Sequence, residues 1–201
     1  MEFTAGLLFA AALVLFSYGF NRWLIGDRLK TDVYRIALTA SAVLLLAILA
    51  ETLVNPLYEL LFGAKLWVYR VFPLHNGNVS ALAPIVWTAY GIHLHFTLQT
   101  MDHRLPIRMR NGYGKAFIVG LEAPFFAEVT GNLLFLVLAG QYYAYYLPSG
   151  VGHLTSFQVV PIYMVCIFIG LIILRALEKL PRRAELPSLL FLAGTGYLLA
   201  G

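Results

Sequence analysis

An almost uninterrupted apolar stretch occupies residues 36–62, IALTASAVLLLAILAETLVNPLYELLF. About 20 predominantly apolar residues are enough for an α-helix to cross the hydrocarbon core of a bilayer. The only charged residues in the stretch are Glu51 and Glu59. The segment therefore predicts a membrane-spanning helix, and an ionisable residue inside such a helix is a candidate for function.

The composition of the whole chain is that of a membrane protein. Hydrophobic residues make up 60% of the 201 residues and charged residues only 12%, whereas a soluble domain has about 45–50% and about 25%. Too few charges are present to cover a surface that faces water. The length fits a single transmembrane domain over residues 1–201, and the lone Cys166 excludes a disulfide framework.

Six apolar stretches qualify as membrane spans by their length and flanking charge. They lie at about 3–20, 36–62, 79–100, 116–140, 157–174 and 186–201. Only helices and closed barrels satisfy all backbone groups in lipid, and stretches of this length are typical of helices. We therefore predict an all-α fold, a polytopic bundle of six transmembrane helices.

The basic residues predict the orientation of this bundle. Of the 14 Lys and Arg residues, 12 lie in the first, third and fifth connections, and only Lys65 and Arg70 lie in the other two. Because cytoplasmic loops are rich in Lys and Arg, both termini should lie on the outer side of the cell membrane. The basic runs are topology signals that can contact membrane lipids, so no nucleic-acid partner is expected.

Aromatic residues cluster where the second and fourth spans should leave the membrane on the outer side. The cluster consists of Trp67, Tyr69, Tyr142, Tyr143, Tyr145 and Tyr146. Amphipathic rings favour the membrane–water interface, so the cluster is interpreted as an anchoring belt.

Part of the chain repeats itself at a constant offset of 77 residues. The pairs of identical residues include Glu51 and Glu128, Asn55 and Asn132, Gly63 and Gly140, Tyr69 and Tyr146, and Pro84 and Pro161. The copies cover about 36–100 and 116–175, that is, spans 2–3 and 4–5. Two helices separate the copies, so both run in the same direction and form a parallel repeat about an axis near the membrane normal. Spans 2 and 4 should then face each other.

Glu51 and Glu128 are expected near the middle of their spans at similar depth. An ionisable residue there costs at least ~2.5–3.5 kcal/mol by insertion scales, so both should face the interior of the bundle. Two carboxyl groups that share a proton are suited to acid–base catalysis. Asn55 and Asn132 lie one helical turn beyond, where they could hold either protonation state or contact a substrate. Alternatively, the Glu and Asn side chains only lock helices together.

Four further residues are candidates for the same site. His95 lies on a polar stripe of the third span and could relay protons, while His93 points about 200° away, so the two do not form a metal clamp. Trp87 and Tyr90 either pack or contact substrate. Glu122 is either a third acid or a partner of the cytoplasmic arginines. We expect neither a metal nor a cofactor, because the motifs that bind them are absent, while a carboxylate-led metal site of Glu51, Glu128 and His95 stays a geometric alternative.

These residues favour an enzyme that acts on an apolar small molecule dissolved in the membrane. A buried acid would protonate a double bond or epoxide, and a facing carboxylate or histidine would accept a proton, with aromatic rings stabilising a cation. Two alternatives remain open. Paired carboxylates also suit a small proton- or cation-coupled transporter, for which a homodimer could supply missing helices. The chain could also be a non-catalytic subunit of a membrane complex.

Inward-facing acids in related halves resemble the small integral-membrane terpene and carotenoid cyclases. The resemblance rests on Glu51 and Glu128 and covers roughly residues 36–174. It implies an isomerase or cyclase of lipid or isoprenoid metabolism. The Pro-x-Glu-Glu run and the Trp-Glu pair of such enzymes are absent, since Glu51 follows Ala50 and Glu128 follows Ala127.

Overall fold

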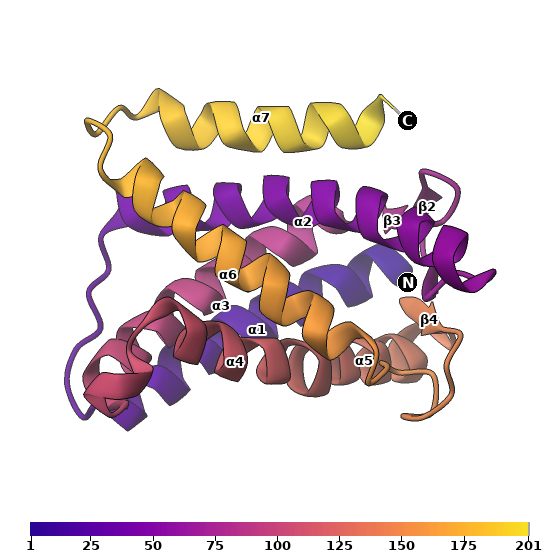
Figure 1. Cartoon of the computed structure of the whole chain (residues 1–201), viewed down its shortest axis with the longest axis horizontal. Helices are drawn as coiled ribbons and strands as arrows, with labels where there is room; N and C mark the ends of the chain where they lie inside the picture. Colours follow the sequence, from indigo (N-terminus) through magenta and orange to yellow (C-terminus); the bar gives the residue numbers. More distant parts are fainter. Residues whose placement is uncertain (201) are drawn as a thin grey trace.

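The computed structural model describes residues 1–200 as a bundle of helices with short strands at one end (Figure 1). The helices are α1 (Glu2–Ile25), α2 (Val33–Phe62), α3 (Ala83–Arg104), a continuous run of α4 (Gly112–Glu122), η2 (Ala123–Glu128) and α5 (Val129–Ala139), α6 (Val159–Glu178) and α7 (Glu185–Leu199). A single 3₁₀ turn, η1 (Ile107–Met109), precedes α4. The strands are β1 (Trp67–Tyr69), β2 (Pro73–Leu74), β3 (Val79–Ser80) and β4 (Ala144–Tyr146).

Four of the helices in residues 1–200 are long and apolar enough to cross a membrane. They are α1, α2, the α4–α5 run and α6. Helix α7 is apolar but has only 15 residues, and α3 is the most polar of the long helices. The structure thus has the apolar helices that a membrane protein requires, while the count of six spans stays a prediction.

Local sequence explains where the helices begin and end. The Asp32 side chain accepts a hydrogen bond from the backbone N–H of Arg35 at 3.2 Å and so caps the start of α2. Gly63 and Gly140 end α2 and α5 in the left-handed conformation, with φ of 75° and 71°. Only glycine adopts this conformation at little cost.

The third span begins later than the sequence suggested. Residues 79–80 form strand β3 and not helix, and α3 starts at Ala83 with Pro84 in its first turn. A proline is favoured there because its missing N–H would have no partner within the helix. Hydropathy did not separate the apolar strand from the helix that follows it.

The fourth span contains a π-helical segment that hydropathy also did not reveal. Pro124 lies in the first turn of η2, within an otherwise continuous helix. Proline removes an N–H from the helical ladder and crowds the preceding turn. Here the helix widens for six residues and continues, which changes the directions of Glu122 and Glu128 relative to a regular helix.

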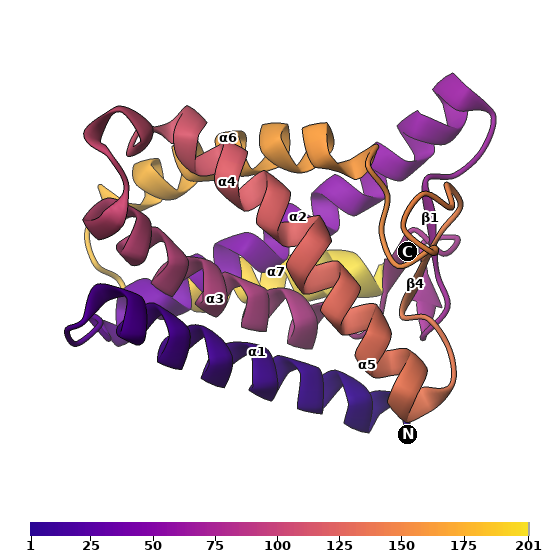
Figure 2. The same cartoon turned by 90° about the horizontal axis from the view of Figure 1, so that it is seen from below.

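The helices pack into a ring around a central space. Helix α1 lies along α3, α3 lies along α2, and α7 covers the outer side of α2. The α4–α5 run crosses the bundle diagonally, with α4 against α6 and α5 against α1 (Figure 2). The closest approach of α2 and α3 depends on Gly91, because a Cβ there would lie 2.6 Å from the Ala40 Cα.

A small antiparallel sheet closes one end of the ring. Strand β1 follows α2 and pairs with β4, which follows α5, so that Val68 lies opposite Tyr145. The start of α1 and the end of α7 lie at this same end (Figure 1). Trp67, Tyr69 and Tyr146 are buried in the sheet, so their interpretation as parts of an anchoring belt is wrong.

Candidate functional site

Glu51 and Glu128 line the same cavity, which has a volume of about 440 Å³. It extends along α2 from Thr39 to Val54, or about 22 Å at 1.5 Å per residue. The remaining wall comes mainly from aliphatic residues and from the aromatic residues Trp67, Trp87, Tyr90, Tyr146 and Tyr163. The cavity is therefore long, largely apolar, and acidic near the end that the strands close.

The cavity reaches the outer surface of the bundle between α2 and α6. Two of its lining residues, Leu53 on α2 and Val165 on α6, are 68% and 59% exposed. In a membrane these side chains face lipid. The opening is therefore lateral, toward the apolar phase.

Glu51 is buried beneath the loop that follows α2. Its Oε1 atom accepts a hydrogen bond from the hydroxyl of Tyr69 in β1. Its Oε2 atom is also buried, and among residues 1–200 it has no hydrogen-bond partner. One carboxyl oxygen of this acid is thus hydrogen-bonded, and the other is buried without a partner in the described part of the chain.

Glu128, at the end of η2, is held on both oxygens. Oε2 accepts a hydrogen bond from the Thr155 hydroxyl and Oε1 from the Tyr163 hydroxyl, each at 2.5 Å. Thr155 lies in the loop before α6 and Tyr163 on α6. The two glutamates therefore share a cavity but differ in their hydrogen-bond partners.

Asn55 is buried and binds the loop that follows its own helix. Its Oδ1 accepts from the backbone N–H of Leu66 at 2.9 Å, and its Nδ2 donates to the carbonyl of Trp67 at 2.8 Å and to Asn78 Oδ1 at 2.9 Å. With these partners Asn55 orders the loop that carries Tyr69.

Asn132 does the same for the loop after α5. Its Oδ1 accepts from the backbone N–H groups of Tyr143 and Ala144 at 2.9 and 3.0 Å, and its Nδ2 donates to the Leu154 carbonyl at 2.6 Å. The asparagines thus bind loop backbone. A purely packing role would require hydrogen bonds between each glutamate and the asparagine of the other helix. Within residues 1–200 no such hydrogen bond is formed.

His95 lies outside the cavity, so the structure does not bring it to the two glutamates. Its ring packs edge-on against Phe96, with the centroids 5.5 Å apart. One turn further along α3, Gln99 exchanges hydrogen bonds with the backbone of Lys30, in the connection between α1 and α2. This side of α3 therefore faces that connection.

Trp87 and Tyr90 do line the cavity, and Glu122 lies behind it. Glu122 accepts a hydrogen bond from the Tyr90 hydroxyl at 3.1 Å and lies 3.1 Å from His93 Nε2. These partners replace the cytoplasmic arginines that were one alternative for Glu122. His93, which sequence analysis set aside, is the histidine that contacts an acid.

The residues whose hydroxyl groups donate hydrogen bonds to the two glutamates were not predicted as site residues. Tyr69 matches Tyr146 at the 77-residue offset but was assigned to the membrane interface. Tyr163 is one of few polar side chains in α6, and this isolation was an available signal. The position of Thr155 depends on how its loop folds back, which has no simple signature in sequence.

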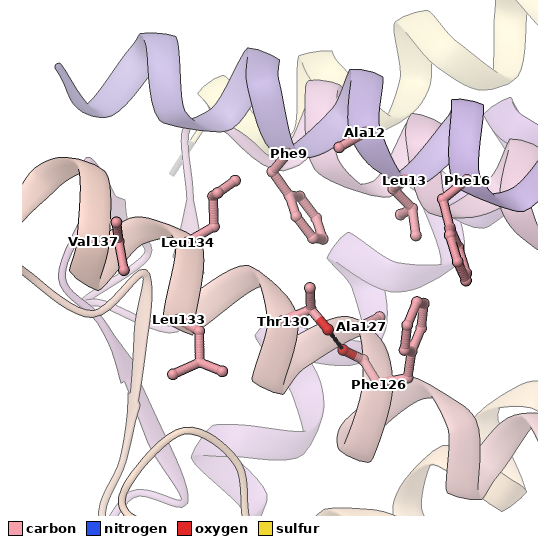
Figure 3. Close-up of a pocket in the computed structure, with 10 residues that line it drawn as sticks. All are labelled: Phe9, Ala12, Leu13, Phe16, Phe126, Ala127, Thr130, Leu133, Leu134 and Val137. Atoms are coloured by element: carbon pink, nitrogen blue, oxygen red, sulfur yellow. Dashed lines mark hydrogen bonds between the residues drawn. The ribbon is translucent and has the colours of Figure 1, made fainter.

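A second hollow, a groove of about 480 Å³, lies between α1 and α5 on another side of the bundle. Phe9 and Phe16 of α1 face Phe126 and Leu134 across it (Figure 3). Its one hydroxyl, that of Thr130, is bonded to the carbonyl of Phe126. No acid lines this groove, so the cavity with Glu51 and Glu128 is the better candidate for chemistry.

Neither a metal site nor a similar known protein indicates the function of this chain. Within residues 1–200, no group of three His, Cys, Asp or Glu side chains is placed to hold a metal ion. No protein-family model, no curated protein and no solved structure matches the chain. The function is therefore inferred from the cavity and its side chains.

Proposed function

We propose that the protein is an integral-membrane enzyme, an isomerase or cyclase, that carries out acid–base chemistry on an apolar lipid or isoprenoid. The observation that carries this proposal is the placement of Glu51 and Glu128 in one long, otherwise apolar cavity with a lateral opening. A hydrated ion would find few polar partners along such a wall. A linear hydrocarbon chain fits it and can enter directly from the bilayer.

The hydrogen-bond partners favour different roles for the two acids. A carboxylate accepts hydrogen bonds on both oxygens, and two hydroxyl donors favour that charged form. Glu128 has two such donors and is suited to act as the base. Glu51 has one bonded oxygen and one unpartnered, buried oxygen, which suits a protonated carboxyl group that donates to the substrate.

In the proposed reaction Glu51 acts as the acid and Glu128 as the base. Glu51 transfers its proton to one carbon of a substrate double bond, and the second carbon becomes a cation. The faces of Trp87, Tyr90 and Tyr146 are available to stabilise this cation, either directly or after ring closure. Glu128 then removes a proton from a carbon next to the cation, and a new double bond forms. The product is an isomer of the substrate, and one proton has moved from Glu51 to Glu128.

The orientation predicted from the basic residues determines which side of the cell membrane the strand end of the cavity faces. Six spans with both termini outside would put the strands and the loops over the glutamates on the outer side. The location of the start of α1 and the end of α7 at the strand end of the bundle supports this arrangement. Substrate would then enter sideways from the bilayer between α2 and α6.

The proposed site is assembled from two related helix–loop units. Each asparagine, Asn55 and Asn132, accepts a hydrogen bond from the backbone N–H group 11 residues further along. The central pair of the sheet, Val68 and Tyr145, is separated by the same 77 residues as the two glutamates. These correspondences support a parallel repeat about an axis that passes near this pair.

The test is an activity assay of the purified protein in lipid nanodiscs with separate Glu51→Gln and Glu128→Gln substitutions. A panel of linear isoprenoids and lipids is incubated with each variant, and products are separated chromatographically. Glu59→Gln is the matched control, because Glu59 is exposed on the same helix and lies outside the cavity. We expect conversion by the wild type and the control, and strong loss in both site variants.

A parallel uptake assay in proteoliposomes distinguishes the alternatives. Proton-dependent uptake that is lost in both site variants, without product formation, would identify a carrier. If both variants retain wild-type behaviour in whichever assay responds, the two glutamates are not the functional acids and the proposal is wrong.

A further inference from the structure

A second polar cluster joins α1, α3 and α4 behind the wall of the cavity, and it is largely buried, with the Glu122 side chain 22% exposed. His93 Nδ1 lies 2.9 Å from Ser17 Oγ, and His93 Nε2 lies 3.1 Å from Glu122 Oε1. The other oxygen of Glu122 accepts a hydrogen bond from the Tyr90 hydroxyl at 3.1 Å. Thr97 Oγ1 lies 3.4 Å from the same His93 nitrogen. The cluster is therefore one continuous set of hydrogen bonds.

The side chains along this set can all pass a proton on. A phenol, a carboxyl group, an imidazole and a hydroxyl each have a donor form and an acceptor form. Ser17 and His93 are only 0% and 5% exposed. Helix packing alone would need no ionisable groups here, and burying them in a membrane is costly. Their presence in an unbroken row is better explained by proton transfer.

One end of the row is at the cavity. Tyr90 contributes to the same wall as Glu51 and Glu128, and it also lines a smaller hollow of about 50 Å³ beside Glu128. Its hydroxyl donates to Glu122, which lies outside the cavity. Tyr90 therefore stands between the two acids of the proposed reaction and the polar row.

The row continues away from the strands. Ser17 lies in the half of α1 that leads to the first basic connection, and Asn21, one turn further, donates to the Ser17 carbonyl at 2.8 Å and to its Oγ at 3.3 Å. On α3, Thr97 lies one turn beyond His93 in the direction of Arg104, where the helix ends. The row thus leads from the cavity toward the basic end of the bundle.

We propose that Tyr90, Glu122 and His93 form a proton relay between the acid cavity and the basic end of the bundle. The relay rests on the proposed function, because it restores the acids after a turnover that leaves Glu51 deprotonated and Glu128 protonated. One proton leaves Glu128 and one reaches Glu51 without any redox change, and within the row each proton passes between hydrogen-bonded groups. Glu122 and His93 are positioning and transfer residues that need not touch the substrate.

The test follows proton exchange at the buried acids and needs no substrate. Purified protein in nanodiscs is transferred from H₂O to D₂O, and the carboxyl C=O band is followed by time-resolved infrared spectroscopy. Bands lost in Glu51→Gln or Glu128→Gln belong to the cavity acids. We expect exchange of these bands to slow about 100-fold in Glu122→Gln, because the amide keeps the shape and polar contacts of the acid but cannot carry its proton.

Two further variants separate proton transfer from structure. Asp102→Asn is the control, because it is the same kind of change at an exposed carboxylate that pairs with Lys115 and takes no part in the row. It should exchange like the wild type. His93→Ala should exchange as slowly as Glu122→Gln, and added imidazole should restore rapid exchange, which a purely structural role would not allow.

Unchanged exchange in both Glu122→Gln and His93→Ala overturns the relay, as does slow exchange in His93→Ala that imidazole does not restore. The absence of any protonated carboxyl band from Glu51 or Glu128 also overturns it, since no proton would then be held there. These results are independent of the activity assay. The enzyme proposal can therefore survive the failure of the relay, and its own failure would appear as unchanged turnover in the cavity variants.

Discussion

The loops after α2 and after α5 are built alike, but the acids beneath them are not. In both loops a buried asparagine binds the backbone, and the strands β1 and β4 then pair with each other. Glu51 has one hydroxyl partner, Tyr69, while Glu128 has two, Thr155 and Tyr163. The comparison teaches that a shared backbone frame can hold two carboxyl groups with different hydrogen-bond partners.

The largest expected effect separates the acid from the base. Glu51→Gln should lower kcat/KM about 10³- to 10⁴-fold, because it removes the group that begins the reaction. Glu128→Gln should lower it about 10²-fold but still allow reversible protonation by Glu51. In D₂O the Glu128→Gln variant should therefore place deuterium in the recovered substrate, as mass spectrometry would show.

The Glu51→Gln variant should place no deuterium in the recovered substrate. Deuterium in substrate recovered from Glu51→Gln, and not from Glu128→Gln, would reverse the assigned roles. Equal incorporation in both would mean that the acids are interchangeable.

The second prediction concerns the shared frame. Asn55→Ala and Asn132→Ala should each destabilise the protein by about 3 kcal/mol, because each leaves buried backbone groups without partners. The two losses should be similar, since the contacts are similar. Unfolding in a denaturing detergent, followed by tryptophan fluorescence, measures both.

The matching aspartates serve as controls. Asn55→Asp and Asn132→Asp keep the accepting oxygen but replace the donating amide by a second acceptor and bury a carboxyl group, so they should lose at least as much stability as the alanine variants. A large loss in one loop with almost none in the other would show that only one asparagine orders its loop.

A third pair of variants tests the hydroxyl partners. Tyr163→Phe keeps the ring but removes one donor to Glu128, so turnover should fall about tenfold, the equivalent of ~1.4 kcal/mol. Tyr69→Phe leaves the free oxygen of Glu51 unchanged and should alter turnover less. Steady-state kinetics of both variants, with Tyr142→Phe as a control outside the cavity, measure the difference. A larger effect of Tyr69→Phe would count against Glu51 as the proton donor.

The smallest effects are expected at the helix ends. Gly63→Ala and Gly140→Ala should each cost about 1 kcal/mol, because alanine is disfavoured at the positive φ that both glycines adopt. Thermal unfolding would detect the shift. At Gly196 in α7 an added Cβ would lie in open space and the backbone φ is not positive. Gly196→Ala should therefore not destabilise the protein. Destabilisation by that control as well would point to a cause other than backbone conformation.

Much of the helical architecture could be predicted, because apolar length and composition determine which segments suit lipid. The shared cavity of Glu51 and Glu128 could also be predicted, since both acids had to avoid lipid and the predicted repeat gave them equivalent places. These inferences rest on patterns of residue type along the sequence, and folding does not change such patterns.

The remaining features depend on how loops and helices meet. Asn55 was predicted to hold a glutamate or to contact a substrate, but it binds the backbone of its own loop. His95 was preferred to His93 because it lay on a polar stripe, and a stripe does not show which neighbouring helix it faces. The π-helical segment at Pro124 changed the direction of Glu122, which no regular helical period could have predicted.

The pairing of β1 with β4 also has a consequence for biosynthesis. Strand β4 begins 77 residues after the start of β1, a length that takes roughly 4–15 s to translate at about 5–20 residues per second. Until then β1 has an unpaired edge, and the loop over Glu51 lacks half of its sheet. The first half of the protein therefore lacks its partner strand until the second half has been synthesised. An arrest of translation between residues 100 and 140 should leave a nascent chain that is inserted but still open to proteases at this loop.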